Sequence, residues 1–384
     1  RIMKQPRVKL YISFFDLIIT YFKILLGIDL YKGKEVKRFE NLLEKHWNKE
    51  KCFTLSTCRV AFYYVLKSLN FQKDDEVLLT PIQIPDFVNV ITNLGLKPVF
   101  VEIDKKTESI DILDLKKKIN NKTKALLATY LTGMVPNISE IKKICDDSNI
   151  FLIEDISQSY GSSYSNKKAG SFGNATIGSL SLGKIISSIG GGFILMDDKQ
   201  KIDYIERILE KDLKLPSKFT LIKICTFYLK VSIVTSKYIF NFFTYYVFLI
   251  FSKISKKKFE EIHRPTFKYT HKDKTIYDNP AIQRNLPLEV FSQFTDLQAK
   301  IAIKTFNKNI NFGLKKRQHL AKILYEELSS KTKKFIPILV GKYDENAYWH
   351  FPIAVESSIK NEFQTYLMKK GYDVVGYGLR LCSH

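Results

Sequence analysis

The stretch Leu152-Ile-Glu-Asp-Ile-Ser-Gln-Ser-Tyr-Gly161 tells more about the fold than any other part of the chain. It begins inside the apolar run Phe151-Leu-Ile, which is typical of a buried strand. Asp155 comes just past the end of that strand. In open α/β sheets, ligand sites lie outside the carboxyl ends of the strands. We therefore expect Asp155 to face a ligand site.

Upstream of this stretch, short apolar runs alternate with amphipathic patterns. Strands are predicted at residues 76–80, 98–102, 125–129 and 151–154, and helices at 86–94, 112–119 and 138–147. Such alternation predicts an α/β fold with a large, mostly parallel sheet. Downstream, the pattern is helical from Leu288 to Leu328, and a mixed segment follows from Phe335 to His384.

A lysine follows the opening stretch in Gly178-Ser-Leu-Ser-Leu-Gly-Lys184, ahead of the glycine run Gly190-Gly-Gly192. Lys184 lies among small and apolar residues between two expected strands. Desolvation lowers the pKa of a lysine and makes the neutral amine available as a nucleophile. A carboxylate and such a lysine in one pocket fit a pyridoxal phosphate (PLP) site. The lysine forms a Schiff base there, and the carboxylate keeps the pyridine nitrogen protonated.

The composition is that of a folded, strongly basic protein. The chain has 384 residues, with 61 Lys and Arg against 39 Asp and Glu, and a net charge of +22. This excess predicts an anionic partner: nucleic acid, a lipid surface or a phosphorylated substrate. Five scattered cysteines without CxxC spacing indicate neither a zinc site nor a redox motif, so no metal is expected. They fit a reduced cytosol and hence a cytoplasmic location.

Two segments, Val8 to Ile28 and Leu213 to Phe259, are unusually rich in apolar and aromatic residues. In each, the polar positions recur at helical spacing, which places them on one face of a helix. The second segment contains no acidic residue. The recurring positions are Lys9, Ser13, Asp16, Thr20 and Lys23 in the first segment, and Lys223, Lys230 and Lys237 in the second.

Two interpretations of these segments remain open. They are core helices whose lysines point at water, or they form a monotopic surface that lies on a membrane with anionic lipids. Basic residues cluster beside both segments, as in Lys253 to Lys258, and this favours the membrane. The same clustering beside apolar helices, rather than among exposed stacking aromatics, argues against nucleic acid.

The ordered motifs resemble the DegT/StrS family of sugar aminotransferases. That family has an acidic pair, then a glutamine three residues after the aspartate, a glycine, a serine, a lysine and a glycine run. The matching positions here are Glu154-Asp155, Gln158, Gly161, Ser179, Lys184 and Gly190 to Gly192. The resemblance implies the type I fold of PLP-dependent transferases, with a large sheet domain and a smaller C-terminal α+β domain. The apolar helical segments would be additions to that fold.

The resemblance also implies roles for single residues. Lys184 would be the catalytic Schiff-base lysine and Asp155 the partner of the pyridine nitrogen. Gln158 would lie near the ring hydroxyl, and Ser179 would bind the cofactor phosphate. Three further candidates occupy positions where the family pattern is altered. Thr57 and Cys58 stand where the family has glycine and threonine at a phosphate-binding helix start, and Phe87 would replace the stacking aromatic after a small shift.

We therefore expect an aminotransferase that moves an amino group from an amino acid, glutamate by family analogy, to a nucleotide- or lipid-linked keto-sugar. This reaction belongs to amino-sugar and polysaccharide biosynthesis at the cytoplasmic side of a membrane, and a homodimer is expected. The alternative is a PLP-fold binding protein that has lost turnover. Two departures support it: Gly190 stands where the family commonly has an acidic residue, and the phosphate-binding helix start is altered at Thr57 and Cys58. Related dehydratases replace the lysine with histidine, whereas Lys184 is present.

The expected division of the chain has four parts. Residues 1–35 are an amphipathic N-terminal segment and 36–205 the large cofactor-binding domain. Residues 206–275 are an apolar, basic helical insertion that faces a membrane. Residues 276–384 are a C-terminal small domain, and whether it is complete stays open.

Overall fold

The computed structural model describes residues 6–8, 10–254, 288–328, 345–374 and 380–381, with the single positions 4, 339 and 342. Lys9 and the cluster Lys256 to Lys258, which the sequence analysis singled out, lie outside the described residues. All statements below concern the described part of the chain.

The centre of the molecule is a seven-stranded sheet with the order β1-β12-β11-β8-β7-β2-β4. The strands from β11 to β4 run parallel, whereas β12 is antiparallel to both β11 and β1. The bounds are β1 Lys51–Leu55, β2 Glu76–Leu79, β4 Lys97–Phe100, β7 Thr123–Thr129, β8 Phe151–Asp155, β11 Ala175–Ser179 and β12 Gly192–Met196. The fold class expected from the sequence is confirmed.

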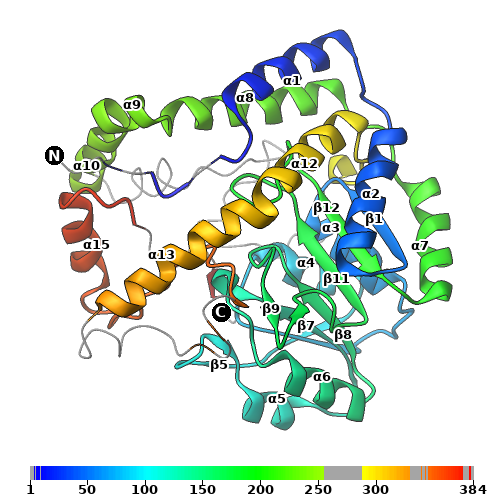
Figure 1. The fold of residues 1–384 in the computed structure, drawn as a ribbon. Coiled ribbons are helices and arrows are strands. Elements are labelled where there is room, and N and C mark those ends of the chain that lie inside the picture. Colours follow the sequence, from blue (N-terminus) through cyan, green and yellow to red (C-terminus); the bar gives the residue numbers. More distant parts are fainter. Residues whose placement is uncertain are drawn as a thin grey trace.

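Helices cover both faces of this sheet (Figure 1). Because side chains alternate along a strand, Leu126 and Leu152 join one core, and Leu127 and Ile153 join the other. The first core includes α2 (Lys34–Trp47), α5 (Ile112–Lys118), α6 (Ile138–Asp147) and α12 (Asp296–Lys308). The second includes α3 (Cys58–Lys67), α4 (Pro85–Asn93) and α7 (Lys199–Asp212).

A third apolar cluster joins the two segments that the sequence analysis singled out. α1 (Phe14–Leu26) and α8 (Lys218–Val234) pack against each other and onto α12 through Leu17, Ile24 and Leu297, among others. The two helices lie side by side along the edge of the molecule (Figure 1). After α8 the chain bends and continues through α9 (Lys237–Ile239), the π-helical turn η2 (Phe240–Thr244) and α10 (Tyr245–Ile254).

Two details of this region differ from the expectation. α1 begins only at Phe14, because the Ser13 hydroxyl caps it by accepting the N–H of Asp16, so the helical face does not extend back to Val8. The lysine face of the second segment is interrupted, since Lys237 opens a new helix after the bend. In the described part of the chain no single helix has the length and hydropathy to cross a bilayer. Lys218–Val234 and Lys237–Ser252 meet those criteria only when counted together, across a bend of 56°.

The remaining elements are short or belong to the C-terminal part. They are β3 (Ile82–Gln83), β5 (Ile103–Asp104), β6 (Ser109–Ile110), η1 (Leu131–Gly133), β9 (Ser163–Tyr164), β10 (Lys167–Lys168), η3 (Leu288–Val290), η4 (Asn309–Gly313), α13 (Leu314–Glu327), α15 (Lys360–Lys369) and β13 (Arg380–Leu381). β13 pairs with β3 in a separate two-stranded sheet, so residues 380–381 lie beside the segment that follows β2. The four-part division of the chain stays a prediction.

Candidate active site

Asp155 ends β8 and is buried at the carboxyl end of the parallel strands. Its Oδ1 atom accepts the N–H of Ser157 at 3.0 Å. Burial raises the pKa of the Asp155 carboxyl, while the hydrogen bonds from Ser157 and the charge of Lys184 act in the opposite direction. A buried carboxylate of this kind is stabilised by a cationic or N–H donor partner.

Lys184 lies in the loop between β11 and β12, so the antiparallel return of β12 brings it to the same end of the sheet as Asp155. Its Nζ atom lies 3.9 Å from the centre of the Trp349 ring. Burial lowers the pKa of Lys184 to about 8, and the negative charge of Asp155 opposes that shift. A large fraction of the amine is therefore neutral at mildly alkaline pH, as a nucleophile requires.

The loop that carries Lys184 is fixed at several points. The Ser188 N–H bonds the Leu180 carbonyl at 2.7 Å, and the Ser187 N–H bonds the Thr305 hydroxyl of α12 at 3.0 Å. The Gly190 N–H donates to the Tyr228 hydroxyl of α8 at 3.3 Å. Helices α8 and α12 thus hold the lysine loop against the sheet.

Thr57 and Cys58 lie at the start of α3, as expected. The Thr57 hydroxyl caps the helix by accepting the Val60 N–H at 3.3 Å, and the Cys58 sulfur lies 3.6 Å from the Ser157 hydroxyl. The pKa of the Cys58 thiol is raised first by burial and then by the charge of Asp155, which places the two groups near each other. The start of a helix favours anions such as phosphate.

Gly192 of β12 packs against the start of α3. A Cβ atom on Gly192 would lie 2.4 Å from the Cys58 nitrogen and from the Thr57 carbonyl carbon. Only glycine lets β12 approach the start of α3 this closely. The third glycine of the run is thus explained by close packing of two backbones.

Gln158 and Ser179 lie on neighbouring parts of the same edge. The buried Gln158 amide oxygen accepts the Thr132 N–H at 2.8 Å, which orients the side chain. Ser179 ends β11, and its hydroxyl lies 2.8 Å from the Ser181 hydroxyl. Both positions fit the expected cofactor contacts, and both roles stay predictions.

Phe87 and Glu154 have core environments. Phe87 is fully buried and packs on Phe62 at 4.9 Å between ring centres, within the core of α3 and α4. These contacts are those of a structural side chain and give no support to a stacking role.

Glu154 is also fully buried, and it accepts hydrogen bonds from the Tyr130 hydroxyl at 2.6 Å and from the N–H groups of Gly170 and Phe172, both at 2.7 Å.

Two residues near Lys184 were missed by sequence reasoning. The Trp349 ring packs over the amine, and its indole N–H donates to the Gly183 carbonyl at 3.0 Å. The His350 N–H bonds the Thr132 carbonyl at 3.1 Å. Burial, followed by the charges of Lys184 and Arg7, lowers the pKa of His350 to about 4, so it is neutral at physiological pH. Local sequence patterns cannot show that Trp349 and His350 pack beside Lys184, because these residues lie far apart in the sequence.

Residues 22–221 match the sequence model of the DegT/DnrJ/EryC1/StrS aminotransferase family. The chain belongs to this family. The matched part contains β1 to β12 and the start of α3, with Asp155, Gln158 and Lys184, and it ends within the first turn of α8. The resemblance stated from the motifs is thereby confirmed.

Curated DegT relatives match over part of their length. The GDP-perosamine synthase of Vibrio cholerae is 31% identical over 177 residues, which are 46% of this chain and 48% of that protein. The UDP-4-amino-4,6-dideoxy-N-acetyl-beta-L-altrosamine transaminase of Helicobacter pylori is 28% identical over 197 residues, or 50% of this chain and 52% of that protein. The chain thus matches about half the length of these relatives.

Solved structures of DegT proteins share the fold over most of the chain. A DegT DnrJ EryC1 StrS aminotransferase from Brucella abortus has a TM-score of 0.67 at 18% identity, covering 96% of this chain and 82% of that one. The E. coli GDP-4-keto-6-deoxy-D-mannose-3-dehydratase with bound hydrated PLP has a TM-score of 0.67 at 20% identity, covering 97% and 84%. The type I transferase fold is therefore shared.

Proposed function

We propose that this protein is a PLP-dependent aminotransferase that converts a keto-sugar to an amino sugar. The observation that carries the proposal is the placement of Lys184, with its pKa near 8, close to Asp155 and to the start of α3. These groups fit the three parts of PLP: an aldehyde for the lysine, a pyridine nitrogen for the buried carboxylate, and a phosphate for the helix start. When bound, PLP supplies an electron sink that stabilises negative charge on the carbon next to the nitrogen.

The residues of this chain supply binding and proton transfer around that group. Asp155 keeps a protonated ring nitrogen in place, and its own burial makes such a partner favourable. The N–H groups at the start of α3 and the Ser179 hydroxyl hold the phosphate. As a neutral amine, Lys184 Nζ takes a proton from the substrate carbon and then returns it to another atom. A pKa near 8 suits both proton transfers near neutral pH. Trp349 covers the amine and excludes water from it.

The names of the relatives support a class of substrate. Two that match this chain are named for GDP- and UDP-linked amino sugars. We propose that the acceptor is a keto-sugar on a nucleotide or a lipid carrier, and that the donor is an amino acid, glutamate by family analogy. The net charge of +22 favours a substrate that carries phosphate. We place the reaction in the cytoplasm, at the membrane surface.

The test is spectroscopic and chemical. The full chain with PLP should gain a visible absorption band that Lys184→Ala abolishes and that the exposed control Lys143→Ala keeps. With glutamate and a nucleotide-linked 4-keto-6-deoxy sugar, mass spectrometry should detect the amino sugar. A band without turnover, over a panel of keto-sugars and amino acids, would support the alternative of a binding protein that has lost catalysis. The absence of the band would contradict both.

A further inference from the structure

The side of α1 that faces away from the protein is apolar. Phe15, Ile19, Phe22 and Leu26 follow each other at helical spacings of 4, 3 and 4 residues, so they form one stripe. Phe15 is 75% exposed and Leu26 is 73% exposed. On the opposite side of the helix, Leu17, Thr20 and Ile24 are buried. α1 is therefore apolar towards the core and also towards the outside.

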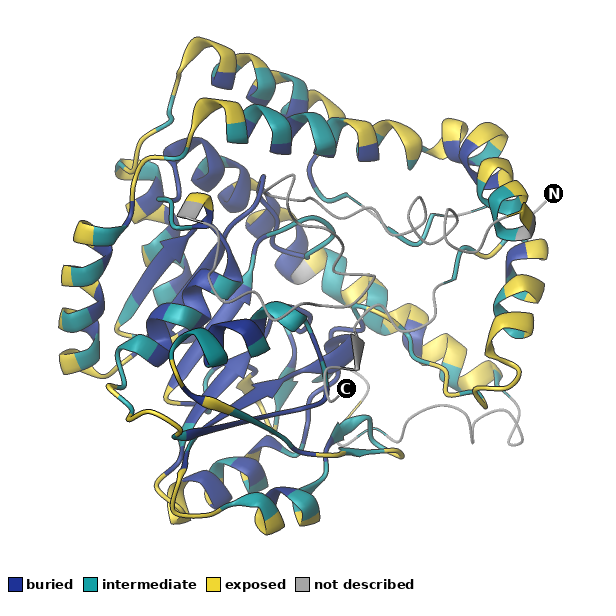
Figure 2. Ribbon diagram, turned by 180° about the vertical axis from the view of Figure 1, so that it is seen from behind, coloured by how far each residue is buried: buried dark blue, intermediate teal, exposed yellow. Residues whose placement is uncertain are grey.

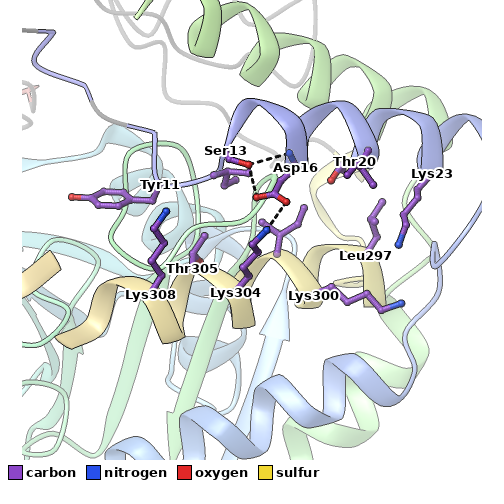
Figure 3. A pocket seen from close by; sticks show the side chains of 13 residues that line it. Tyr11, Ser13, Asp16, Thr20, Lys23, Leu297, Lys300, Lys304, Thr305 and Lys308 are labelled. Carbon is purple, nitrogen blue, oxygen red and sulfur yellow. Dashed lines mark hydrogen bonds and ion pairs between the residues drawn. The ribbon is translucent and has the colours of Figure 1, made fainter. Parts of the chain in front are cut away.

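The polar residues of α1 do not explain this exposure, because they face the protein. Asp16 bonds Lys304 of α12 at 2.6 Å, and Lys23 pairs with Asp29 at 3.5 Å. Both line a cavity of about 150 Å³ between α1 and α12 (Figure 3). Lys300 lines the same cavity and pairs with Asp29 at 2.7 Å. An ordinary surface helix turns its polar side to water. Here the ion pairs fix that side against α12 and hold the apolar stripe outward.

The neighbouring helices extend the apolar surface and add positive charge. On α8, Phe219, Lys223 and Lys230 share the outward side, and the Lys223 ammonium lies 4.2 Å from the centre of the Phe219 ring. After the bend, Tyr238, Phe242 and Phe243 are about 70% exposed on α9 and η2 (72%, 69% and 69%). Figure 2 shows exposed residues along the outer edges of these helices, with the buried residues on the inner side.

We propose that this outer surface binds the face of a lipid bilayer that contains anionic lipids. It consists of the α1 stripe, the outward residues of α8, and the exposed aromatics of α9 and η2. Apolar side chains enter the boundary between headgroups and acyl chains, and the lysines meet the lipid phosphates. The helices lie in the membrane plane, because their inner sides are packed on α12 and on the lysine loop.

A second copy of the chain fits the same surface less well. In a two-fold symmetric dimer the same patch meets itself. The chain has no acidic residue between Leu213 and Phe259, so such a contact would place lysines of α8 near lysines of the other copy without a carboxylate from these helices. Interface cores are depleted of charged residues. A bilayer with anionic headgroups supplies the missing negative charge.

Vesicle flotation of the full-length protein tests the proposal, with vesicles of phosphatidylcholine alone or mixed with phosphatidylglycerol. The stripe variant carries Phe15→Ser, Ile19→Ser, Phe22→Ser and Leu26→Ser. It should lose affinity by at least about 100-fold for both kinds of vesicle, since four apolar side chains no longer leave water. A matched control, Leu113→Ser with Phe312→Ser, removes two equally exposed apolar side chains on other helices and should bind like the original protein.

The charge contribution is tested separately. Lys223→Gln with Lys230→Gln should weaken binding to the anionic vesicles by about fivefold per lysine and leave the weaker binding to neutral vesicles unchanged. The exposed lysines of α5 and α6, changed as Lys117→Gln with Lys143→Gln, are the control. High salt should release only part of the bound protein.

Three outcomes would overturn the membrane proposal. The original protein stays unbound with both vesicles, the stripe variant floats as well as the original, or the stripe variant has a lower sedimentation mass because the surface joins two copies. Near-ultraviolet circular dichroism checks that each variant is folded. The visible band with PLP is recorded on the same samples, so failure of the catalytic proposal is distinguished from failure of this one.

Discussion

At the scale of single residues, the adjacent carboxylates of Glu154 and Asp155 have different surroundings. Alternation along β8 places Glu154 and Asp155 on different faces of the sheet. Glu154 accepts hydrogen bonds from Tyr130 and from the loop at Gly170 and Phe172, and Asp155 lies at the candidate site near Lys184. Their mutations should therefore affect different properties of the protein.

Glu154→Gln should lower the free energy of unfolding by about 2–3 kcal/mol, because an amide cannot accept all of these donors and one buried group is left unsatisfied. The measurement is urea denaturation of the variant and the original protein. If the two midpoints coincide, the structural role of Glu154 is wrong.

Asp155→Asn should keep the visible band with PLP, because Lys184 is unchanged, but lower turnover by about 100-fold or more, because an uncharged amide no longer stabilises the protonated ring nitrogen. Steady-state kinetics with the identified substrate pair measures this change. Unchanged turnover would remove Asp155 from the mechanism.

The depressed pKa of Lys184 predicts a pH dependence. Because burial lowers this pKa from 10.5 to about 8, the neutral amine accumulates between pH 6 and 8 and is dominant above that range. The rate of covalent PLP capture should rise about tenfold per pH unit below 8 and level off above it. Stopped-flow absorbance from pH 6 to 10.5 measures the profile. His350 does not titrate in this window, since its pKa is near 4. An inflection near 10 would show that the amine is not desolvated.

At the scale of elements, the contact between β12 and α3 gives a sharp test. Gly192→Ala should destabilise the fold by about 3 kcal/mol and weaken PLP binding, because its Cβ would overlap the backbone of Thr57 and Cys58. Gly313→Ala is the matched control. Gly313 has helical dihedral angles and its nearest neighbour atom would be 3.6 Å away, so alanine should stabilise by about 0.5 kcal/mol. Thermal melts and PLP titrations of both variants measure the effects.

The helices and strands also show which features of the fold can be predicted from the sequence. The parallel strands β2, β4, β7 and β8 and the three helices between them were predicted to within two residues, because each has a strong local pattern of its own. β1, β11 and β12 were not delimited, and the pairing of β1 with β12 joins distant positions. The orientation of α1 could not be predicted, because the partners of Asp16 and Lys23 that turn its polar side inward include Lys304, far along the chain.

The same limit applies to the candidate site. Asp155, Gln158 and Lys184 could be predicted because a family motif has the same order and spacing, and their roles stay predictions. Trp349 and His350 reach Lys184 only through the tertiary fold, where the segment that carries them bonds Gly133 and Thr132. Phe87 was proposed from its position near the expected aromatic, but its contacts are those of the α3–α4 core.

At the scale of the whole molecule, the family fold leads us to predict a homodimer with two-fold symmetry. Sedimentation equilibrium should give twice the mass of the chain, both for the original protein and for the stripe variant, because the α1 stripe is proposed to face lipid rather than the other subunit. A monomer that still turns over substrate would contradict the dimer.

The pairing of β1 with β12 also has a consequence for how the protein is made. These strands are about 140 residues apart in sequence, and Gly192 of β12 packs against the start of α3. At about 5–20 residues per second, the ribosome needs roughly 7–28 seconds to produce the second strand after the first. During that time the nascent chain has residues 57 and 58 but not β12, the strand that packs against them at the proposed phosphate site. A cofactor phosphate that binds there, as proposed, therefore meets a complete site only after synthesis has passed Met196.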